Sequence, residues 1–255
     1  MNKELLIDGI KKLGMETTEE QIERFSKYSE LLKEWNNKIN LTAITDDDGI
    51  SVKHFLDSIL PLAHIEIKTG ANIADVGTGA GFPGLPIKII RDDINLTLID
   101  SLNKRINFLT LVSSELNLSN TVCVHGRAED LSRKPEYREK FDYVISRAVA
   151  NMTALSEYCL PYIKPGGMFI ALKAEGAEQE VDSARAMIGN LGGRIDKIIK
   201  APLPNSDIVR SLIVIKKVKP TPKSFPRTSK KIKQQSKPVP VSYTHLRAHE
   251  TLSDL

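Results

Sequence analysis

One glycine-rich turn constrains the fold of this 255-residue chain more than any other feature of its sequence. An apolar run at residues 72–76 leads into Gly77, Gly79 and Gly81, and a second apolar run begins at Leu85. This order is typical of a strand, a tight turn and the start of a helix, which is how nucleotide-type cofactor sites begin. Glycine lets a ligand approach the backbone, and a helix start presents free N–H groups. The turn therefore predicts a cofactor site at the end of the strand.

Two carboxylates near the turn indicate which cofactor it binds. The segment 79–84 fits the G-x-G-x-x-G pattern, and Asp100 follows about 20 residues later, as an NAD site requires. Asp75, however, would repel an incoming pyrophosphate and attract the ammonium group of S-adenosylmethionine. Asp100 closes the next strand, where it can accept hydrogen bonds from both ribose hydroxyls. We therefore predict an S-adenosylmethionine site that includes Asp75, Gly77, Gly79 and Asp100; NAD, and a turn that merely connects strand to helix, are the alternatives.

From residue 71 the sequence alternates between strand and helix patterns. Strands are expected at 72–76, 95–99, 121–125, 141–146, 167–173, 194–201 and 209–217. Helices are expected at 84–91, 102–117, 151–163 and 176–191, with 126–140 largely loop. Such alternation predicts a mainly parallel sheet with helices on both faces. The segment 202–208 is too short for a helical crossover, so the last two strands should form an antiparallel hairpin. The expected fold is α/β, a Rossmann-like class I methyltransferase with a seven-stranded sheet.

The chain divides into three expected regions. Residues 1–65 read as a helical section packed on the catalytic domain, and 66–218 as the S-adenosylmethionine-binding domain. In the first, a capping box at Thr18 and a helix from Asp48 to a stop at Pro61 are expected. The tail, 219–255, is rich in Pro, Lys, Ser and Gln and should be disordered or draped on the surface. Its last stretch, 242–255, looks unrelated to what precedes it.

Composition and charge limit the remaining possibilities. The net charge of +4 is uneven, because residues from 210 onward carry eleven Lys or Arg and two acids. A basic tail suits phosphate contact, although a solvated tail explains the same composition. Two cysteines, Cys123 and Cys159, indicate neither a zinc site nor disulfides, and no metal is expected. Without a secretory signal pattern or an apolar run of roughly 20 residues, a cytoplasmic protein is expected.

Five segments in order resemble one family, RsmG (glucose-inhibited division protein B). Its members methylate guanine N7 in small-subunit ribosomal RNA, and the resemblance covers about residues 5–227. The segments that carry it are Asn36-Asn37-Lys38-Ile39-Asn40-Leu41-Thr42-Ala43 with His54-Phe55-Leu56-Asp57-Ser58; the turn from Asp75 to Gly84; Asp100-Ser101 with Lys104-Arg105; Gly126-Arg127-Ala128-Glu129; and Ser146-Arg147-Ala148-Val149.

The resemblance implies S-adenosylmethionine as cofactor, with Gly77, Phe82, Ala128, Glu129 and Arg147 at the matching positions. Ala128 and Glu129 follow the third strand, where a backbone N–H and a carboxylate can reach the adenine edge. Phe82 would line the pocket with apolar surface, although a core residue at a helix start is an alternative. Arg147 closes the fourth strand and faces the crevice where ligands enter open α/β sheets.

Guanine N7 has a free lone pair at neutral pH, so attack on the sulfonium methyl needs no general base. Positioning should supply most of the acceleration of an in-line displacement. Arg147 is the expected catalytic residue, because it could hold guanine O6 or a phosphate. A structural alternative pairs it with Asp142 or Glu129. Methyltransferases that act on cytosine C5 need a cysteine nucleophile at the catalytic crevice, and neither Cys123 nor Cys159 is expected to lie there.

Five basic residues are the expected RNA contacts: Lys38, Lys104, Arg105, Lys173 and Arg227. His54 is more simply a structural histidine. The expected partner is 16S ribosomal RNA or the small ribosomal subunit. The protein is expected to be a monomer that binds no membrane and has no obligate protein partner. Two alternatives stay open: an S-adenosylmethionine-dependent methyltransferase with another substrate, and a non-catalytic RNA-binding module.

Overall fold

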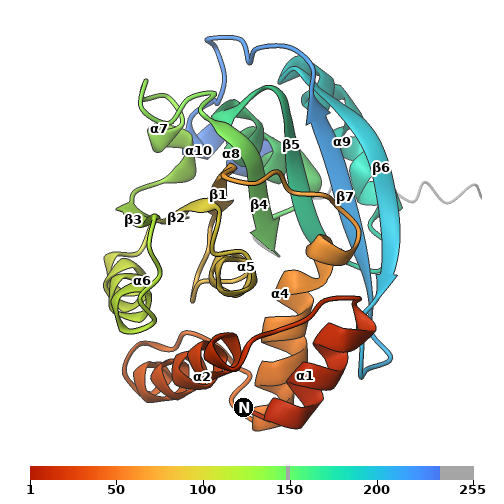
Figure 1. The fold of residues 1–255 in the computed structure, drawn as a ribbon. Helices are drawn as coiled ribbons and strands as arrows, with labels where there is room; N and C mark the ends of the chain where they lie inside the picture. Colours follow the sequence, from red (N-terminus) through yellow and green to blue (C-terminus); the bar gives the residue numbers. More distant parts are fainter. Residues whose placement is uncertain (148–149, 236–255) are drawn as a thin grey trace, which may run out of the picture.

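The structure of the protein is a computed structural model that describes residues 1–147 and 150–235. Within these residues, seven strands form one sheet in the order β3-β2-β1-β4-β5-β7-β6 (Figure 1). The first five strands are parallel, and β7 is antiparallel to both β5 and β6. The strands are β1 (Asn72–Val76), β2 (Asn95–Asp100), β3 (Thr121–His125), β4 (Phe141–Arg147), β5 (Ile163–Ala174), β6 (Gly193–Pro202) and β7 (Val209–Lys217). The expected α/β fold with a final hairpin is confirmed.

Side-chain alternation along the strands divides the core into two layers. Ile73 and Tyr143 point to one face of the sheet, and their neighbours Ala74 and Val144 point to the other. The first face is covered by α1 (Lys3–Lys12), α2 (Glu19–Ile39), α5 (Gly84–Ile90) and α6 (Asn103–Glu115). The second is covered by α8 (Met152–Cys159) and α9 (Glu178–Asn190) (Figure 1). Because the N-terminal helices share a core with the sheet, we propose that 1–65 packs on the domain at 66–218.

The order of the strands reverses between β1 and β4, which places a crevice at their carboxyl ends. The turn after β1 lies at this switch point and begins with Gly77, whose φ is 73°. Gly79 and Gly81 have φ values of 62° and 100°, which residues other than glycine rarely adopt. The glycine turn therefore enters α5 beside the crevice, as the sequence predicts.

The N-terminal section contains the expected capping box, in which Thr18 and Gln21 bond reciprocally at the start of α2. The single helix expected from Asp48 to Pro61 is instead a composite. It consists of α3 (Asp47–Gly49), the π-helix η1 (Ile50–Leu56), α4 (Asp57–Ile59) and the 3-10 turn η2 (Leu60–Ala63). The wider π-helical turn lies against β4, and π-helical segments are frequent at functional sites.

The sequence predicted a tail that is disordered or draped on the surface, and the part that the structure describes lies against the domain. Thr221, Pro226 and Ile232 are buried, and Ser229–Gln235 form the helix α10. Three isolated buried residues, one of them the polar Thr221, produce no hydrophobic period, so the composition gave no sign of them. The expected segment 242–255 lies outside the described residues.

Smaller differences concern element ends. The short helix α7 (Ala128–Leu131) lies in the region expected to be loop. The helix expected at 151–163 ends at Cys159, and the 3-10 turn η3 (Leu160–Tyr162) follows it. No helix among the described residues is long and apolar enough to cross a bilayer.

Candidate active site

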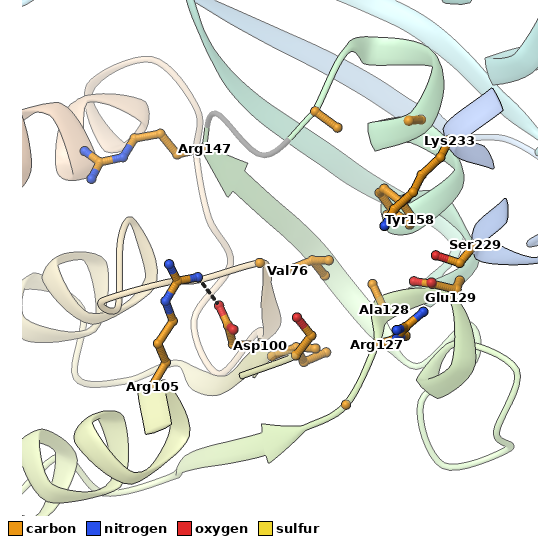
Figure 2. A pocket seen from close by; sticks show the side chains of 16 residues that line it. Val76, Asp100, Arg105, Arg127, Ala128, Glu129, Arg147, Tyr158, Ser229 and Lys233 are labelled. Atoms are coloured by element: carbon orange, nitrogen blue, oxygen red, sulfur yellow. Dashed lines mark hydrogen bonds and ion pairs between the residues drawn. The ribbon is translucent and has the colours of Figure 1, made fainter. Parts of the chain in front are cut away.

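A cavity of about 680 Å³ lies at the carboxyl ends of β1, β2, β3 and β4 (Figure 2). Its wall includes residues that directly end or follow these strands: Val76, Gly77, Asp100, Gly126, Glu129 and Arg147. The structure thus brings together predicted residues that are up to 70 positions apart in the sequence.

The Asp100 carboxylate is fixed at the end of β2 by backbone donors. Its Oδ2 accepts from Gly79 N at 3.0 Å, and its Oδ1 accepts from Leu102 N at 2.9 Å. Arg105 Nη1 lies 3.4 Å from Oδ2 (Figure 2). These contacts orient the carboxylate toward the cavity that it lines, and a carboxylate has about four acceptor positions, so one is left for a ligand hydroxyl.

Ala128 and Glu129 begin α7 immediately after β3. Tyr162 Oη donates to the Ala128 carbonyl at 2.8 Å, which fixes the start of this helix against η3. The Glu129 side chain lines the cavity although Glu129 is only 6% exposed. A nearly buried carboxylate facing a cavity is suited to a ligand that donates hydrogen bonds.

Asp75 is not part of the cavity wall but belongs to the glycine turn. Its Oδ2 accepts from Thr78 Oγ1 and Gly84 N, both at 2.7 Å, so the carboxylate ties the turn to the start of α5. Its Oδ1 is one of the few buried side-chain atoms of the described residues that have no partner. Complete burial raises the pKa of Asp75 to about 7. The direct ammonium contact predicted from the sequence is therefore replaced by a role in shaping the turn.

Arg147 lines the cavity, and its guanidinium extends toward the N-terminal section, which holds it (Figure 2). Arg147 Nη1 donates to Asp57 Oδ2 at 2.9 Å and to the Lys53 carbonyl at 3.1 Å. Arg147 Nη2 lies 3.4 Å from His54 Nδ1. The partners come from η1 and from the first residue of α4, so the π-helical segment presents both carbonyl and carboxylate acceptors to one side chain.

The structural alternative for Arg147 named the wrong partners. Asp142 is at the opposite end of β4 and pairs with Lys164 at 2.6 Å. Glu129 faces the cavity from α7. The carboxylate that pairs with Arg147 is Asp57, which is 90 positions away in the sequence.

Asp57 joins two guanidinium groups and was missed by the sequence analysis as a site residue. Arg210 Nε on β7 donates to Asp57 Oδ1 at 2.7 Å, while Arg147 contacts Oδ2. Asp57 is 1% exposed, so its charge requires such partners. The three groups together carry one net positive charge beside the cavity. An acid close to the apolar residues Phe55, Leu56 and Ile59 of an expected helix was the signal that could have found it.

Phe82 lies in an aromatic cluster beneath the guanidinium. The His54 ring stacks on Phe82 with centroids 4.4 Å apart, and Arg147 Cζ lies 5.0 Å from the same ring. Tyr28 stacks on it from α2 at 5.5 Å. Phe82 is 6% exposed and is absent from the cavity wall. The structure therefore favours the core alternative, in which the Phe82 ring packs against the Arg147 guanidinium.

His54 is neutral in this setting. Burial, and then the Arg147 charge, lower its pKa to about 3. Arg147 can only donate, so His54 Nδ1 must accept, and Nε2 carries the proton toward Thr42 Oγ1 at 2.8 Å. His54 therefore orients groups around it, as expected of a structural histidine.

Three of the five predicted RNA contacts remain accessible. Lys38 is exposed on α2, where it pairs with Glu34 at 2.7 Å. Lys104 is exposed in the first turn of α6, and Arg105 lines the cavity edge. We retain these three as proposed contacts. The exposed Lys38–Glu34 pair, one turn apart on a helix, is weak and can exchange for a phosphate.

The other two predicted RNA contacts are engaged inside the protein. Lys173 Nζ pairs with Glu180 at 2.8 Å and donates to the Ala150 carbonyl, and its side chain is 12% exposed. Arg227 forms a two-pronged pair with Glu157, which is fully buried. Both cations are compensated by carboxylates, so they are assigned to the fold rather than to RNA.

The two cysteines offer no nucleophile to the cavity. Cys159 is buried in α8, and Cys123 is partly buried in β3. Burial raises the pKa of both thiols, which disfavours the thiolate. Cytosine-C5 chemistry is therefore disfavoured at this site.

The fold and the cavity define a class of protein, the Rossmann-like methyltransferases. The cavity volume lies within the roughly 300–1,000 Å³ of small-molecule sites, and its glycine backbone and two carboxylates fit an adenosyl cofactor. The family model of GidB, described as rRNA small subunit methyltransferase G, matches residues 21–202. The chain belongs to the GidB family.

Curated relatives cover most of the chain. It is 51% identical to ribosomal RNA small subunit methyltransferase G of Clostridium perfringens over 215 residues, which are 84% of this chain and 90% of that protein. It is 50% identical over 225 residues to the protein of the same name from Lachnoclostridium phytofermentans, with coverages of 88% and 93%. The family resemblance stated from the sequence is thereby confirmed.

Solved structures agree on the fold at low sequence identity. A chain of the complex between the Haloferax volcanii Trm112 methyltransferase activator and a putative methyltransferase superposes with a TM-score of 0.52. The two sequences are 15% identical, and the superposition covers 74% of this chain and 98% of that one. A SAM-dependent methyltransferase from Aquifex aeolicus gives 0.50 at 17% identity, with coverages of 75% of this chain and 97% of that one.

Proposed function

We propose that this protein transfers a methyl group from S-adenosylmethionine to N7 of a guanine in 16S ribosomal RNA. The observation that carries the proposal is one cavity whose wall combines the carboxylates of Asp100 and Glu129 with Arg147. The GidB family match supports the ribosomal substrate. We further propose that the protein acts as a monomer in the cytoplasm, on free RNA or on the small subunit.

The cofactor would be held by groups already oriented in the cavity. Asp100 would accept a ribose hydroxyl at its remaining acceptor position, and Ala128 and Glu129 would meet the adenine edge. Gly77 would let the methionine portion approach the backbone. When bound, S-adenosylmethionine supplies a methyl group on a positively charged sulfur.

Arg147 would orient the acceptor. Guanine N7 needs no deprotonation, so the residues have only to align it and exclude water. A guanidinium presents donors that match guanine O6 or a phosphate. Asp57 and the Lys53 carbonyl restrict where this guanidinium can lie, and the one net positive charge of the cluster suits an electron-rich partner.

Incubation with methyl-labelled S-adenosylmethionine and bacterial small-subunit RNA tests the proposal. We expect label on N7 of a guanine, located by cleavage of the RNA at the modified base. Label on N6, C5 or a ribose would contradict the N7 assignment, and binding of the RNA without any transfer would favour the non-catalytic alternative. The same assay with intact subunits separates the two forms of substrate.

A further inference from the structure

The helix α10 contributes two residues to the wall of the cavity. Ser229 and Lys233 line it together with Glu129 and Tyr158. Residues four positions apart lie on the same face of a helix, so this one face of α10 points into the cavity. In Figure 2 the Lys233 side chain extends from α10 toward Tyr158, and Ser229 lies beside Glu129.

A buried ion pair anchors α10 in this position. Arg227 Nη2 donates to Glu157 Oε2 at 2.6 Å, and Arg227 Nε lies 3.0 Å from Oε1. The Arg227 backbone N–H donates to the same carboxylate. Glu157 is fully buried in α8, next to the cavity residue Tyr158. Two-pronged guanidinium–carboxylate contacts fix orientation as well as distance, so α10 starts from a defined point.

The segment that leads to α10 is also fixed by side-chain donors. Arg138 donates to the carbonyls of Thr221, Pro222 and Phe225. Arg133 donates to the next carbonyl, that of Pro226. After the turn, Ile232 is 1% exposed, so α10 also buries an apolar residue. Hydrogen bonds to four carbonyls, one ion pair and one buried side chain therefore fix the segment 221–232 in a defined position beside the cavity.

We propose that α10 is part of the cofactor site and that Ser229 and Lys233 contact the adenosine end of S-adenosylmethionine. This inference rests on the proposed function. The adenosine end is assigned because the α10 residues share their part of the wall with Glu129 and with Tyr158 of α8. The Lys233 stem can cover the flat purine while its ammonium stays hydrated, and the Ser229 hydroxyl adds a donor and an acceptor.

Matched substitutions on the same helix test the proposal in the full chain. The double variant Ser229→Ala/Lys233→Ala removes both cavity groups, and Lys230→Ala removes an exposed lysine that is not part of the cavity wall. The Kd of S-adenosylhomocysteine, the demethylated product, is measured by calorimetry. We expect the double variant to bind about tenfold more weakly, which corresponds to ~1.4 kcal/mol, and Lys230→Ala to bind within about twofold of the parent. Lys233→Ala alone should fall between them.

Two results would overturn the proposal. One is a double variant whose affinity stays within about twofold of the parent, and the other is an equal loss in Lys230→Ala and Lys233→Ala, which would indicate a general charge effect. Melting curves establish that the variants are folded. A second route is Arg227→Met, which should weaken cofactor binding by releasing α10. A parent chain that binds no S-adenosyl compound would instead refute the proposed function itself.

Discussion

At the scale of single residues, the Asp57 carboxylate is the centre of the site's electrostatics. It lies between Arg147 and Arg210, and all three come from different parts of the chain. The carboxylate is almost fully buried, so each guanidinium offsets part of its desolvation. Removing one arginine leaves the acid with a partner, whereas removing the acid leaves two adjacent cations. The two kinds of substitution should therefore differ in their effect on stability.

Arg147→Ala should keep the fold but lose most methyl transfer. Arg210 still contacts both oxygens of Asp57 in this variant, so the buried charge remains paired. We expect kcat/KM on the RNA to fall roughly 100-fold, equivalent to ~2.7 kcal/mol, with a smaller change in the melting temperature. Asp57→Asn should lose both turnover and about 3 kcal/mol of unfolding free energy. Near-normal turnover by Arg147→Ala would contradict its catalytic role.

Asp75 should make stability depend on pH. Burial raises its pKa from the usual 3.8 to about 7 in the folded protein, so folding favours its protonated form. Its contribution is therefore fully present below pH 3.8 and is lost as pH rises through about 7, up to about 4 kcal/mol. Asp75→Asn can still accept from Thr78 and Gly84 but cannot ionise.

Denaturant unfolding of the parent and of Asp75→Asn between pH 4 and pH 8 measures this difference. We expect the free energies of unfolding to diverge in favour of the variant as pH rises. Other groups titrate in both proteins and cancel in the comparison. Parallel curves would show that the Asp75 pKa is not raised in the folded state.

At the scale of elements, the glycine turn and the composite helical segment determine the site. Gly81 has a φ of 100°, and a Cβ there would meet Tyr28 Oη and Leu85 Cδ1 at 2.5 Å. Gly79 has a φ of 62°, and a Cβ there would meet no atom within 4 Å. The two glycines are therefore required for different reasons, one for close packing against α2 and α5 and the other for backbone conformation alone.

Gly81→Ala should destabilise the protein far more than Gly79→Ala. The second change incurs only the left-handed backbone penalty of roughly 1–2 kcal/mol, whereas the first adds steric overlap with Tyr28 and Leu85. Thermal melting of both variants checks this order. Equal losses would mean that the turn relaxes around Gly81 and that its packing against α2 is not required.

Periodicity predicted most elements but not the ones that complete the site. The strands at 72–76 and 121–125 and the capping box at Thr18 were predicted correctly, because local sequence decides them. The start of β5 at Ile163 was missed, since the Pro-Gly-Gly sequence that follows looks like a turn, yet Ile163 pairs with Phe141. The π-helix η1 and α10 depend on Arg147 and Glu157, partners far away in sequence.

For the site, strand-end positions were predictable and side-chain partners were not. Asp100, Glu129 and Arg147 reach one cavity because parallel strands end at one edge of a sheet. Whether Arg227 meets RNA or Glu157 depends on how the C-terminal segment packs, and charge alone does not decide it. Phe82 was ambiguous for the same reason, since its neighbours come from α2 and η1.

At the scale of the whole molecule, we propose that the N-terminal section and the sheet domain form one packed unit. They share a hydrophobic core, and Asp57 ties them through β4 and β7. Trp35, the single tryptophan of the chain, lies on α2 with its ring 5.7 Å from that of Phe108 on α6. The indole therefore reports on the contact between the two parts.

Unfolding followed by Trp35 fluorescence should coincide with unfolding followed by circular dichroism. A shared core makes separate melting of the helical section unfavourable, so a single transition is expected in both signals. Phe108→Leu, which changes the neighbour of the indole, should shift both midpoints together. A fluorescence midpoint at clearly lower denaturant would show that the section at 1–65 opens by itself.

The position of Asp57 in the chain has a consequence for biosynthesis. Arg210, one of its two cationic partners, is made 153 residues after it. Until β7 emerges, the nascent helical section carries an acid that it cannot bury at low cost. The helical section is thus translated before a strand that completes its packing, and until β7 emerges its apolar helix faces are available to molecular chaperones.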